Sequence, residues 1–225
     1  MKKLAIFIAT LMLFTLMNSI SEVSGAVKQF KTISIGDTGK RVFLIKRSFN
    51  IKPLTNRYSH KAKVRVKQFQ RDRGLPVTGR VNERTYNKIV RRWDGIKAER
   101  AKNYKRVMTV ARNQIGDPYV YGASGPGAFD CSGLTKFTYG RATGINLYHQ
   151  ASAQSRYATR ISRSQARKGD LVFFYNGGGV YHTSIYAGHG RIIHASTPGT
   201  NVHRSRIWSN NVFYGRVFKR YIPTK

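Results

Sequence analysis

A single cysteine, Cys131, is the feature that most constrains how this chain of 225 residues can fold. A chain with one thiol forms no internal disulfide, so its fold must rest on ordinary hydrophobic cores. The length is sufficient for one medium-sized domain and one small domain. Two interpretations of the thiol stay open at this point: it is used chemically, or it is buried and inert.

The N-terminal residues have the three-part order of a secretory signal. A short basic start precedes an apolar run at 4–17, and a polar segment follows that ends in the small residues Ser24 and Ala26. This order predicts a signal peptide over residues 1–26. The apolar run is shorter than the roughly 20 residues that span a bilayer, so we expect no stable membrane anchor. The chain is therefore expected to be secreted, into a periplasm or a cell wall.

The charge of the chain is extreme and points to a polyanionic partner. There are 41 lysines and arginines against 9 acidic residues, a formal net charge of +32. Such a field concentrates a protein on polyanions. Export and the absence of a recognition motif argue against nucleic acid, so we expect anionic wall polymers as partners.

The segment 32–93 has the pattern of three short helices joined by small-residue turns. A turn at 36–39 precedes apolar residues at helical spacing, and a second helical pattern covers 64–73. Asn82 is placed to cap a third helix. A compact helical domain is predicted, with a plain helical spacer as the alternative.

This first domain resembles the peptidoglycan-binding module found in bacterial wall hydrolases. The residues that carry the resemblance are Gly36, Gly39, Val42, Phe69, Gln70, Gly74, Leu75, Gly79, Thr85 and Tyr86. The sequence departs from the family pattern between Asn50 and Lys63, where the usual acidic-Gly-aromatic turn is missing. The resemblance implies peptidoglycan as a partner, and the departure concerns the details of glycan contact.

The segment 94–104 is charged and is predicted to be a linker, and a second domain is expected over 105–225. Its texture changes along the chain from helical to strand-like. The runs LVFFY, HTSIYA, RIIHAS and VFYGRVFKRYI are short, rich in β-branched and aromatic residues, and bounded by turn residues. Helices followed by strands predict an α+β domain with an antiparallel sheet packed on helices.

Cys131 lies at the predicted start of a helix. A glycine-rich loop leads into Phe129-Asp130-Cys131-Ser132-Gly133, after which apolar residues follow at helical spacing. Unpaired backbone N–H groups at a helix N-terminus favour the reactive thiolate. Asp130 can cap the helix, but its charge opposes the thiolate, so a basic partner is needed. An unpaired thiol in an exported protein risks oxidation, which favours chemical use over an inert cysteine.

A histidine is the partner that such a cysteine needs, because imidazole can take the thiol proton and later protonate a leaving amine. His182 and His194 each lie in a strand-like run, and pairing of the two strands could bring them onto one face. One would act as the base and the other would orient it. No spacing ties the other histidines of this domain to the cysteine, so we expect them to lie apart from it: His149 in a polar loop or at a helix start, and His189 and His203 in turns flanked by Gly or Ser.

The motifs FDCSGL, GDLVFF, HTSIYAG and IIHAS, in this order, resemble the NlpC-type family of papain-like cell-wall cysteine peptidases. The resemblance covers about 101–221. It implies that Cys131 is the nucleophile, His182 the general base and His194 the polar third member. It also implies that Tyr119 lies near the oxyanion hole.

The same resemblance places Asp130 and Ser132 at the site that binds the substrate amine. Asp170 is better interpreted as part of a structural turn than as a catalytic residue. One departure is Thr183-Ser184, where the family usually has Val-Gly, although no catalytic group is lost there.

The sequence therefore predicts a secreted peptidoglycan hydrolase that cleaves stem-peptide amide bonds through a thioester on Cys131. The resemblance implies the D-isoglutamyl–diamino acid bond as the target. Neither a metal nor a cofactor is expected, because no ligand spacing such as HExxH occurs. Two alternatives stay open: a Cys-His amidase or acyltransferase acting on another wall substrate, and a non-catalytic wall-binding protein.

Overall fold

The structure is a computed structural model that describes residues 29–218. The predicted signal peptide, residues 1–26, lies outside the described residues. The chain divides into two compact units, Met1–Arg47 with Ile51–Lys88, and Ser48–Asn50 with Ile89–Lys225. None of the helices in the described part of the chain combines the length and the apolar character that crossing a bilayer requires.

The first unit is built from short helices, as predicted. Its helices are α2 (Lys40–Ser48) and α3 (His60–Asp72) and the start of α4 (Glu83–Asn113). Ser59 caps α3 by accepting a hydrogen bond from the N–H of Ala62. These elements surround a core that includes Val42, Ile45, Tyr58, Val66, Phe69 and Val81.

Turns of the first unit are fixed by side chains that bond to backbone. The amide of Gln70, buried to 1% exposure, donates to the carbonyl of Arg80 and accepts from the N–H of Gly79. The hydroxyl of Tyr58 donates to the carbonyl of Gly79 at 2.8 Å. The resemblance residues Gln70 and Gly79 therefore hold the loop that follows α3.

The segment predicted to be a linker, residues 94–104, is helical and lies within α4. Asn82 caps this helix, since its side chain accepts a hydrogen bond from the N–H of Thr85 at 2.9 Å. The division between the two units falls after Lys88, whereas the sequence placed the domain boundary after residue 93. Most residues of 94–104 are exposed, so the charged side chains of this segment belong to the solvent-facing surface of the helix.

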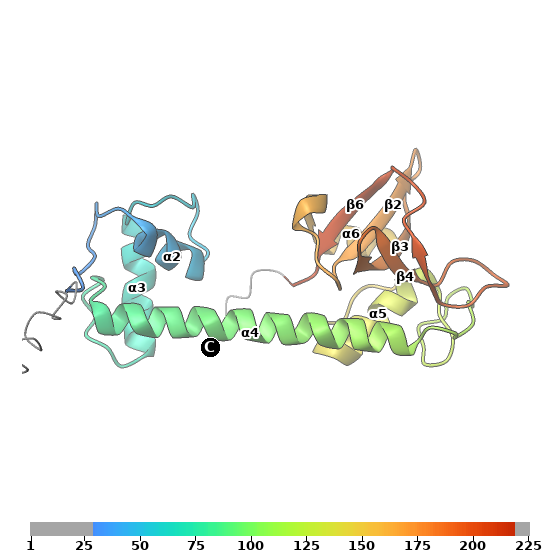
Figure 1. Cartoon of the computed structure of the whole chain (residues 1–225), viewed down its shortest axis with the longest axis horizontal. Helices are drawn as coiled ribbons and strands as arrows, with labels where there is room; N and C mark the ends of the chain where they lie inside the picture. Colours follow the sequence, from blue (N-terminus) through green and yellow to red (C-terminus); the bar gives the residue numbers. More distant parts are fainter. Residues whose placement is uncertain (1–28, 219–225) are drawn as a thin grey trace, which may run out of the picture. The chain divides into compact units, whose positions relative to one another are not determined.

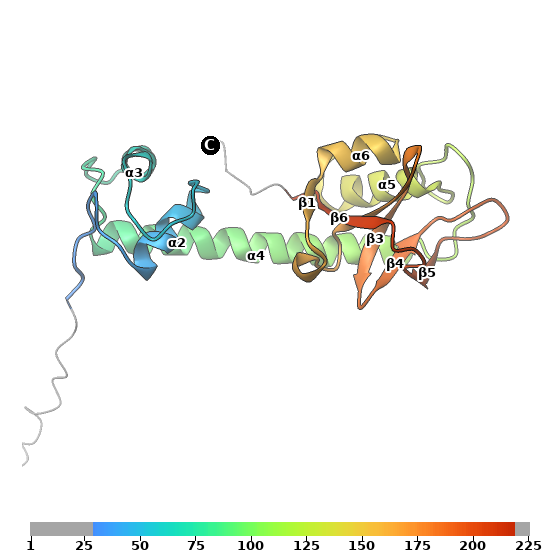
Figure 2. The same ribbon diagram turned by 90° about the horizontal axis from the view of Figure 1, so that it is seen from above.

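The second unit contains a six-stranded antiparallel sheet with helices on one face (Figures 1 and 2). The helices of this unit are the later part of α4, α5 (Cys131–Thr143), α6 (Ala151–Tyr157) and the short η2 (Arg163–Gln165). The strands are β1 (Thr159–Ile161), β2 (Leu171–Asn176), β3 (Gly179–Gly188), β4 (Arg191–His194), β5 (His203–Arg206) and β6 (Val212–Arg216). Their order in the sheet is β1-β6-β2-β3-β4-β5. The predicted α+β class is confirmed.

The two faces of the sheet have different cores. The larger core joins one face to α4 and α5, and it includes Val107, Ala111, Leu134, Tyr139, Phe173, Ile185 and Ile193. The smaller core lies on the other face and consists of Val172, Phe174, Tyr186, Ile192 and Tyr214. Alternation along each strand assigns neighbouring residues to opposite faces.

A buried carboxylate connects the turn before β2 to the rest of the second unit. Asp170 is fully buried, accepts a hydrogen bond from the hydroxyl of Tyr104 at 2.7 Å, and forms an ion pair with Arg216 at 2.8 Å. It thereby links α4, β2 and β6. The structural interpretation of Asp170 is consistent with these contacts.

Candidate active site

Cys131 is the first residue of α5, and Asp130 is its N-cap. One carboxylate oxygen of Asp130 accepts from the N–H of Gly133 at 2.6 Å and from the hydroxyl of Ser132 at 3.1 Å. A Cβ at Gly133 would lie 2.0 Å from the carbonyl oxygen of Ala123, so only glycine lets the preceding loop approach the helix this closely. The sequence Asp-Cys-Ser-Gly therefore fixes both the cap and the path of the loop.

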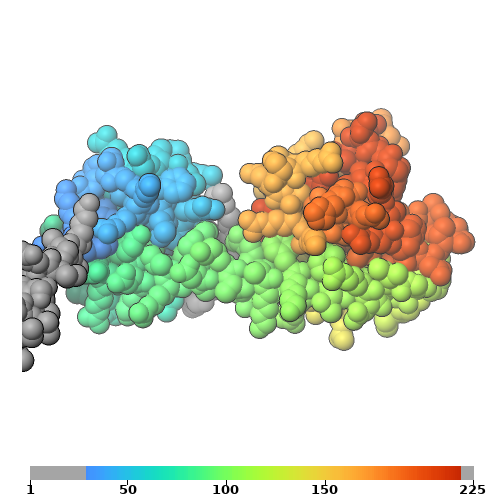
Figure 3. All heavy atoms as spheres, viewed as in Figure 1, coloured from blue at the N-terminus to red at the C-terminus, as the bar shows by residue number. Residues whose placement is uncertain are grey.

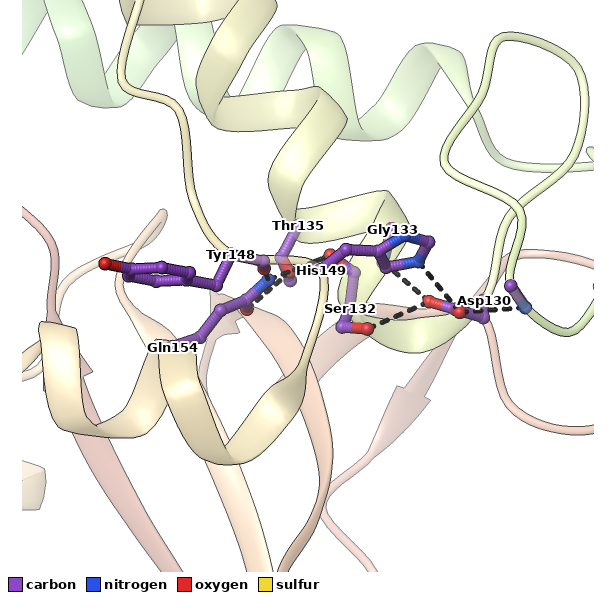
Figure 4. Close-up of polar contacts among 8 residues, drawn as sticks. Asp130, Ser132, Gly133, Thr135, Tyr148, His149 and Gln154 are labelled. Carbon is purple, nitrogen blue, oxygen red and sulfur yellow. Dashed lines mark hydrogen bonds and ion pairs between the residues drawn. The ribbon is translucent and has the colours of Figure 1, made fainter.

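The second carboxylate oxygen of Asp130 is also engaged (Figure 4). It accepts from the N–H of Gly122 at 3.0 Å and contacts Nε2 of His149 at 2.9 Å. The placement of His149 apart from the cysteine region was wrong, because this histidine contacts the residue that precedes Cys131. Its sequence neighbours, Tyr148 and Gln150, give no pattern that would have indicated this contact.

Gln154, from α6, connects the start of α5 to the loop that carries Tyr148 (Figure 4). Its amide nitrogen donates to the carbonyls of Ser132 and Tyr148, at 2.9 and 2.7 Å. Its amide oxygen accepts from the hydroxyl of Thr135 at 2.7 Å. The side chain is fully buried, so these contacts fix the first turn of the helix that bears Cys131.

His182 and His194 lie on adjacent strands, as the sequence predicted. β3 pairs with β4 with Ile185 opposite Ile193, a register that places both histidines on the face opposite to those isoleucines. Nε2 of His182 lies 3.1 Å from Nδ1 of His194. Both rings are buried, with 6% and 2% of their surface exposed.

Aromatic side chains surround this pair of histidines. Phe174 lies opposite His182 across β2 and β3. Trp208 stacks on Phe174 with ring centroids 4.1 Å apart, and its centroid is 5.1 Å from that of His194. Because Trp208 is 52% exposed, it covers the histidines on one side and faces solvent on the other.

His203 is close to the pair, contrary to the sequence prediction. It lies on β5, directly opposite His194, with ring centroids 4.6 Å apart. The Gly- and Ser-flanked setting led us to predict a turn, but the edge strand β5 forms there by pairing with β4. His189 lies in the turn between β3 and β4, as expected, with a positive φ of 52°.

Burial is the main influence on the Cys131 thiol and raises its pKa. The carboxylate of Asp130 raises it further, whereas the backbone of Thr183, of Ser132 and of Cys131 itself lowers it, so the net pKa of Cys131 is raised. Thr183 lies on β3 and directly follows His182, so the electrostatic environment of the thiol includes the strand that carries the candidate base.

Burial also governs the candidate bases. It lowers the pKa of His182 to about 4, and with the charges of the neighbouring histidines it lowers the pKa of His194 to about 3. A buried site that raises the thiol pKa and lowers the imidazole pKa favours the neutral form of both groups. This differs from the readily ionised thiol expected from the helix N-terminus alone.

Tyr119 lies in the loop that leads to the cysteine, where it forms a bridge with Phe129. Burial and the nearby charges of Cys131 and Asp130 raise the pKa of its hydroxyl. Tyr119 is therefore close enough to the thiol to be influenced electrostatically by it. The phenol remains a proton donor at neutral pH.

A cysteine at the start of a helix and a histidine on a strand of the sheet, with a second polar residue on the next strand, are the features of the papain-like class of α+β fold. Residues 116–219 match the family described as NlpC/P60 family, and residues 42–89 match a putative peptidoglycan binding domain. The second unit therefore carries an NlpC/P60 domain, and the first carries a peptidoglycan-binding domain.

Curated relatives match about half of this chain. The chain is 43% identical over 114 residues to the probable endopeptidase p60 of Listeria monocytogenes, covering 49% of this chain and 23% of that protein. It is 41% identical over 103 residues to a probable endopeptidase of Corynebacterium glutamicum, covering 46% of this chain and 48% of that protein. The chain thus spans less than half the length of either relative.

Among solved structures, the chain is similar to the NlpC/p60 domain of the peptidoglycan hydrolase SagA. The identity is 36%, the TM-score is 0.47, and the match covers 50% of this chain and 97% of that one.

Proposed function

We propose that this protein is a peptidoglycan hydrolase that cleaves amide bonds of stem peptides through a thioester on Cys131. The observation that carries the proposal is the buried His182–His194 pair on β3 and β4, together with Cys131 at the start of α5. It is supported by the family of the second unit and by the peptidoglycan-binding domain of the first. The resemblance favours the D-isoglutamyl–diamino acid bond as the target.

The catalytic cycle that these residues support begins with proton transfer from the Cys131 thiol to Nδ1 of His182. The sulfur attacks the carbonyl carbon and the C=O bond opens to an oxyanion. In this proposal the backbone N–H of Cys131 and the hydroxyl of Tyr119 stabilise that oxyanion, and one such donor is typically worth roughly 3–4 kcal/mol of barrier.

The tetrahedral intermediate then collapses to a thioester as the C–N bond breaks. The imidazolium of His182 gives its proton to the departing amine and becomes neutral again. A water molecule, deprotonated by the same imidazole, hydrolyses the thioester and releases the free thiol. His194 holds the ring of His182 throughout this cycle.

Asp130 and Ser132 have a second proposed role at the substrate amine. The carboxylate of Asp130 already accepts hydrogen bonds from Gly133, Ser132 and Gly122 and contacts His149. These contacts fix its orientation. A substrate ammonium would interact with a carboxylate that is held in place in advance, which reduces the entropy lost on binding.

The net charge of +32 supports anionic wall polymers as further partners, and the chain is proposed to act outside the cell. In α4 the exposed basic residues are Arg84, Arg91, Lys97, Lys102, Lys105, Arg106 and Arg112, and the surface of this helix is the green band in Figure 3. Binding to purified walls should weaken steeply with salt, because exposed charges are screened beyond roughly 8–10 Å near physiological ionic strength. Salt-independent adsorption would argue against this electrostatic role.

The proposed activity is tested by digesting purified peptidoglycan and analysing the released muropeptides by mass spectrometry. Wild type should release new amino termini, whereas Cys131→Ala and His182→Ala should release none above background. Ser155→Ala is the matched control, since its hydroxyl donates to the carbonyl of Ser152 within α6. Wall pelleting should be retained in every variant.

Two results would contradict the proposal. Release of amino termini by Cys131→Ala would exclude the nucleophile assignment. Transfer of an acyl group to an added amine, without net hydrolysis, would identify an acyltransferase using the same residues.

A further inference from the structure

A chain of hydrogen bonds extends from the His182–His194 pair to the edge strand β5. Nε2 of His194 lies 3.0 Å from the hydroxyl oxygen of Ser205. The hydroxyl of Ser205 in turn donates to the carbonyl of Arg206 at 3.2 Å. In the pairing of β4 with β5, Ser205 lies opposite Ile192, which brings it onto the same face as His194.

The end of this chain suggests a direction for the bonds in it. A carbonyl oxygen only accepts, and Ser205 has a single O–H. When that O–H donates to Arg206, the oxygen of Ser205 is left to accept, and Nε2 of His194 donates to it.

A neutral imidazole has one N–H and one lone pair, so the rest of the pattern follows. If His194 donates from Nε2, its Nδ1 accepts, and the contact at 3.1 Å requires Nε2 of His182 to donate. Nδ1 of His182 is then unprotonated. Burial keeps both histidines neutral, since it lowers the pKa of each far below 7.

We propose that Ser205 is a positioning residue that selects the histidine tautomers in which Nδ1 of His182 can accept a proton. The proposal rests on the proposed function, because that lone pair matters only if it receives the thiol proton of Cys131. Were the hydroxyl of Ser205 instead to donate to His194, both tautomers would reverse. His182 would then carry its proton on Nδ1 and could not act as a base.

Other groups near His194 do not compete for its Nε2. His203 packs against the ring, but its own Nδ1 lies 2.7 Å from the carbonyl of Asn201 and must donate there. Trp208 makes ring contacts with His194. Among the described residues, Ser205 is the one whose hydroxyl is placed to set the tautomer.

The test compares wild type, Ser205→Ala and Ser205→Thr by ¹⁵N NMR of the histidine side chains at neutral pH, together with steady-state kinetics. In wild type, His182 and His194 should both be the Nε2–H tautomer. Ser205→Ala should show a measurable population of the Nδ1–H tautomer of His194. Its kcat should fall about tenfold while KM changes little, because the tautomer affects proton transfer and not binding.

Ser205→Thr keeps the hydroxyl and should restore both the tautomer and kcat. Ser155→Ala, the control within α6, should alter neither. Unchanged tautomers in Ser205→Ala, or a wild type with the proton on Nδ1 of His194, would overturn the proposal. A wild type that has the expected tautomers but hydrolyses no peptidoglycan would refute the proposed function and leave the tautomer assignment standing.

Discussion

Replacing Gln154 by alanine should destabilise the second unit and slow catalysis together. The side chain is fully buried and makes three hydrogen bonds, to the carbonyls of Ser132 and Tyr148 and to the hydroxyl of Thr135. At about 1 kcal/mol of net stability per bond, their loss amounts to about 3 kcal/mol. For a domain of this size, that free energy corresponds to a fall in Tm of roughly 6–12 °C.

The catalytic effect should be visible where the variant is still fully folded. Ser132 follows Cys131 directly and its carbonyl keeps only the bond from Thr135 among its side-chain partners in the described residues, so losing the Gln154 bond loosens the turn that positions the sulfur. Peptidoglycan hydrolysis by Gln154→Ala at 20 °C below its own Tm should therefore show a lower kcat.

Gln114→Ala is the matched control for this experiment. Its amide donates a hydrogen bond to the carbonyl of Val110 at 3.1 Å, across the end of α4, so the Tm of Gln114→Ala should fall by a third as much or less. Calorimetric unfolding of both variants measures the difference. Equal Tm values for the two variants would refute the argument that Gln154 holds the helix start.

Three further predictions concern titratable groups that are buried in the second unit. Burial lowers the pKa of His182 from 6.5 to about 4 and that of His194 to about 3, so the unfolded chain binds more protons in acid than the folded protein does. The free energy of unfolding should therefore fall as the pH is lowered from 6.5 towards 4. Urea unfolding at several pH values measures this, and a flat profile would contradict it. The pKa of Cys131 is raised above 9.0, so iodoacetamide alkylation should rise only in alkaline solution, whereas a plateau at low pH would reveal a thiolate–imidazolium pair. Asp170→Asn leaves the charge of Arg216 partly buried without its counterion, which should cost about 3–5 kcal/mol in a thermal unfolding assay; an unchanged Tm would exclude this.

The main elements of the fold could be predicted because their signals are local. Small-residue turns and strand-like runs indicated the helices of the first unit and the strands β2, β3, β4 and β6. Asp130 was identified as a cap from its position before a helical pattern, and the side chain does accept from Gly133. Each of these inferences used residues that are close together in the chain.

The supporting contacts of the site could not be predicted, because they join distant segments. His149 and Gln154 lie 19 and 22 residues from their partners Asp130 and Ser132. Strand β5 has alternating charged residues and no apolar run, and it exists because β4 offers it an edge to pair with. Its histidine, His203, was therefore assigned to a turn.

The extent of α4 was also obscured by composition. The run of charges at 94–104 resembles a linker when each residue is judged for polarity alone. In the structure the apolar residues Tyr104, Val107, Met108 and Ala111 follow at helical spacing and are buried in the large core. Their burial stabilises the last turns of a helix whose middle is charged and exposed.

The residues of the site pack against two different cores, one on each face of the sheet. The helix that begins with Cys131 packs on the larger core, whereas Phe174, opposite His182, belongs to the smaller one. Substitutions can therefore accumulate around one partner while the neighbours of the other stay unchanged. Substitutions in the smaller core or at Trp208 could therefore change the pKa of His182 during evolution, while the helix that begins with Cys131 keeps its packing.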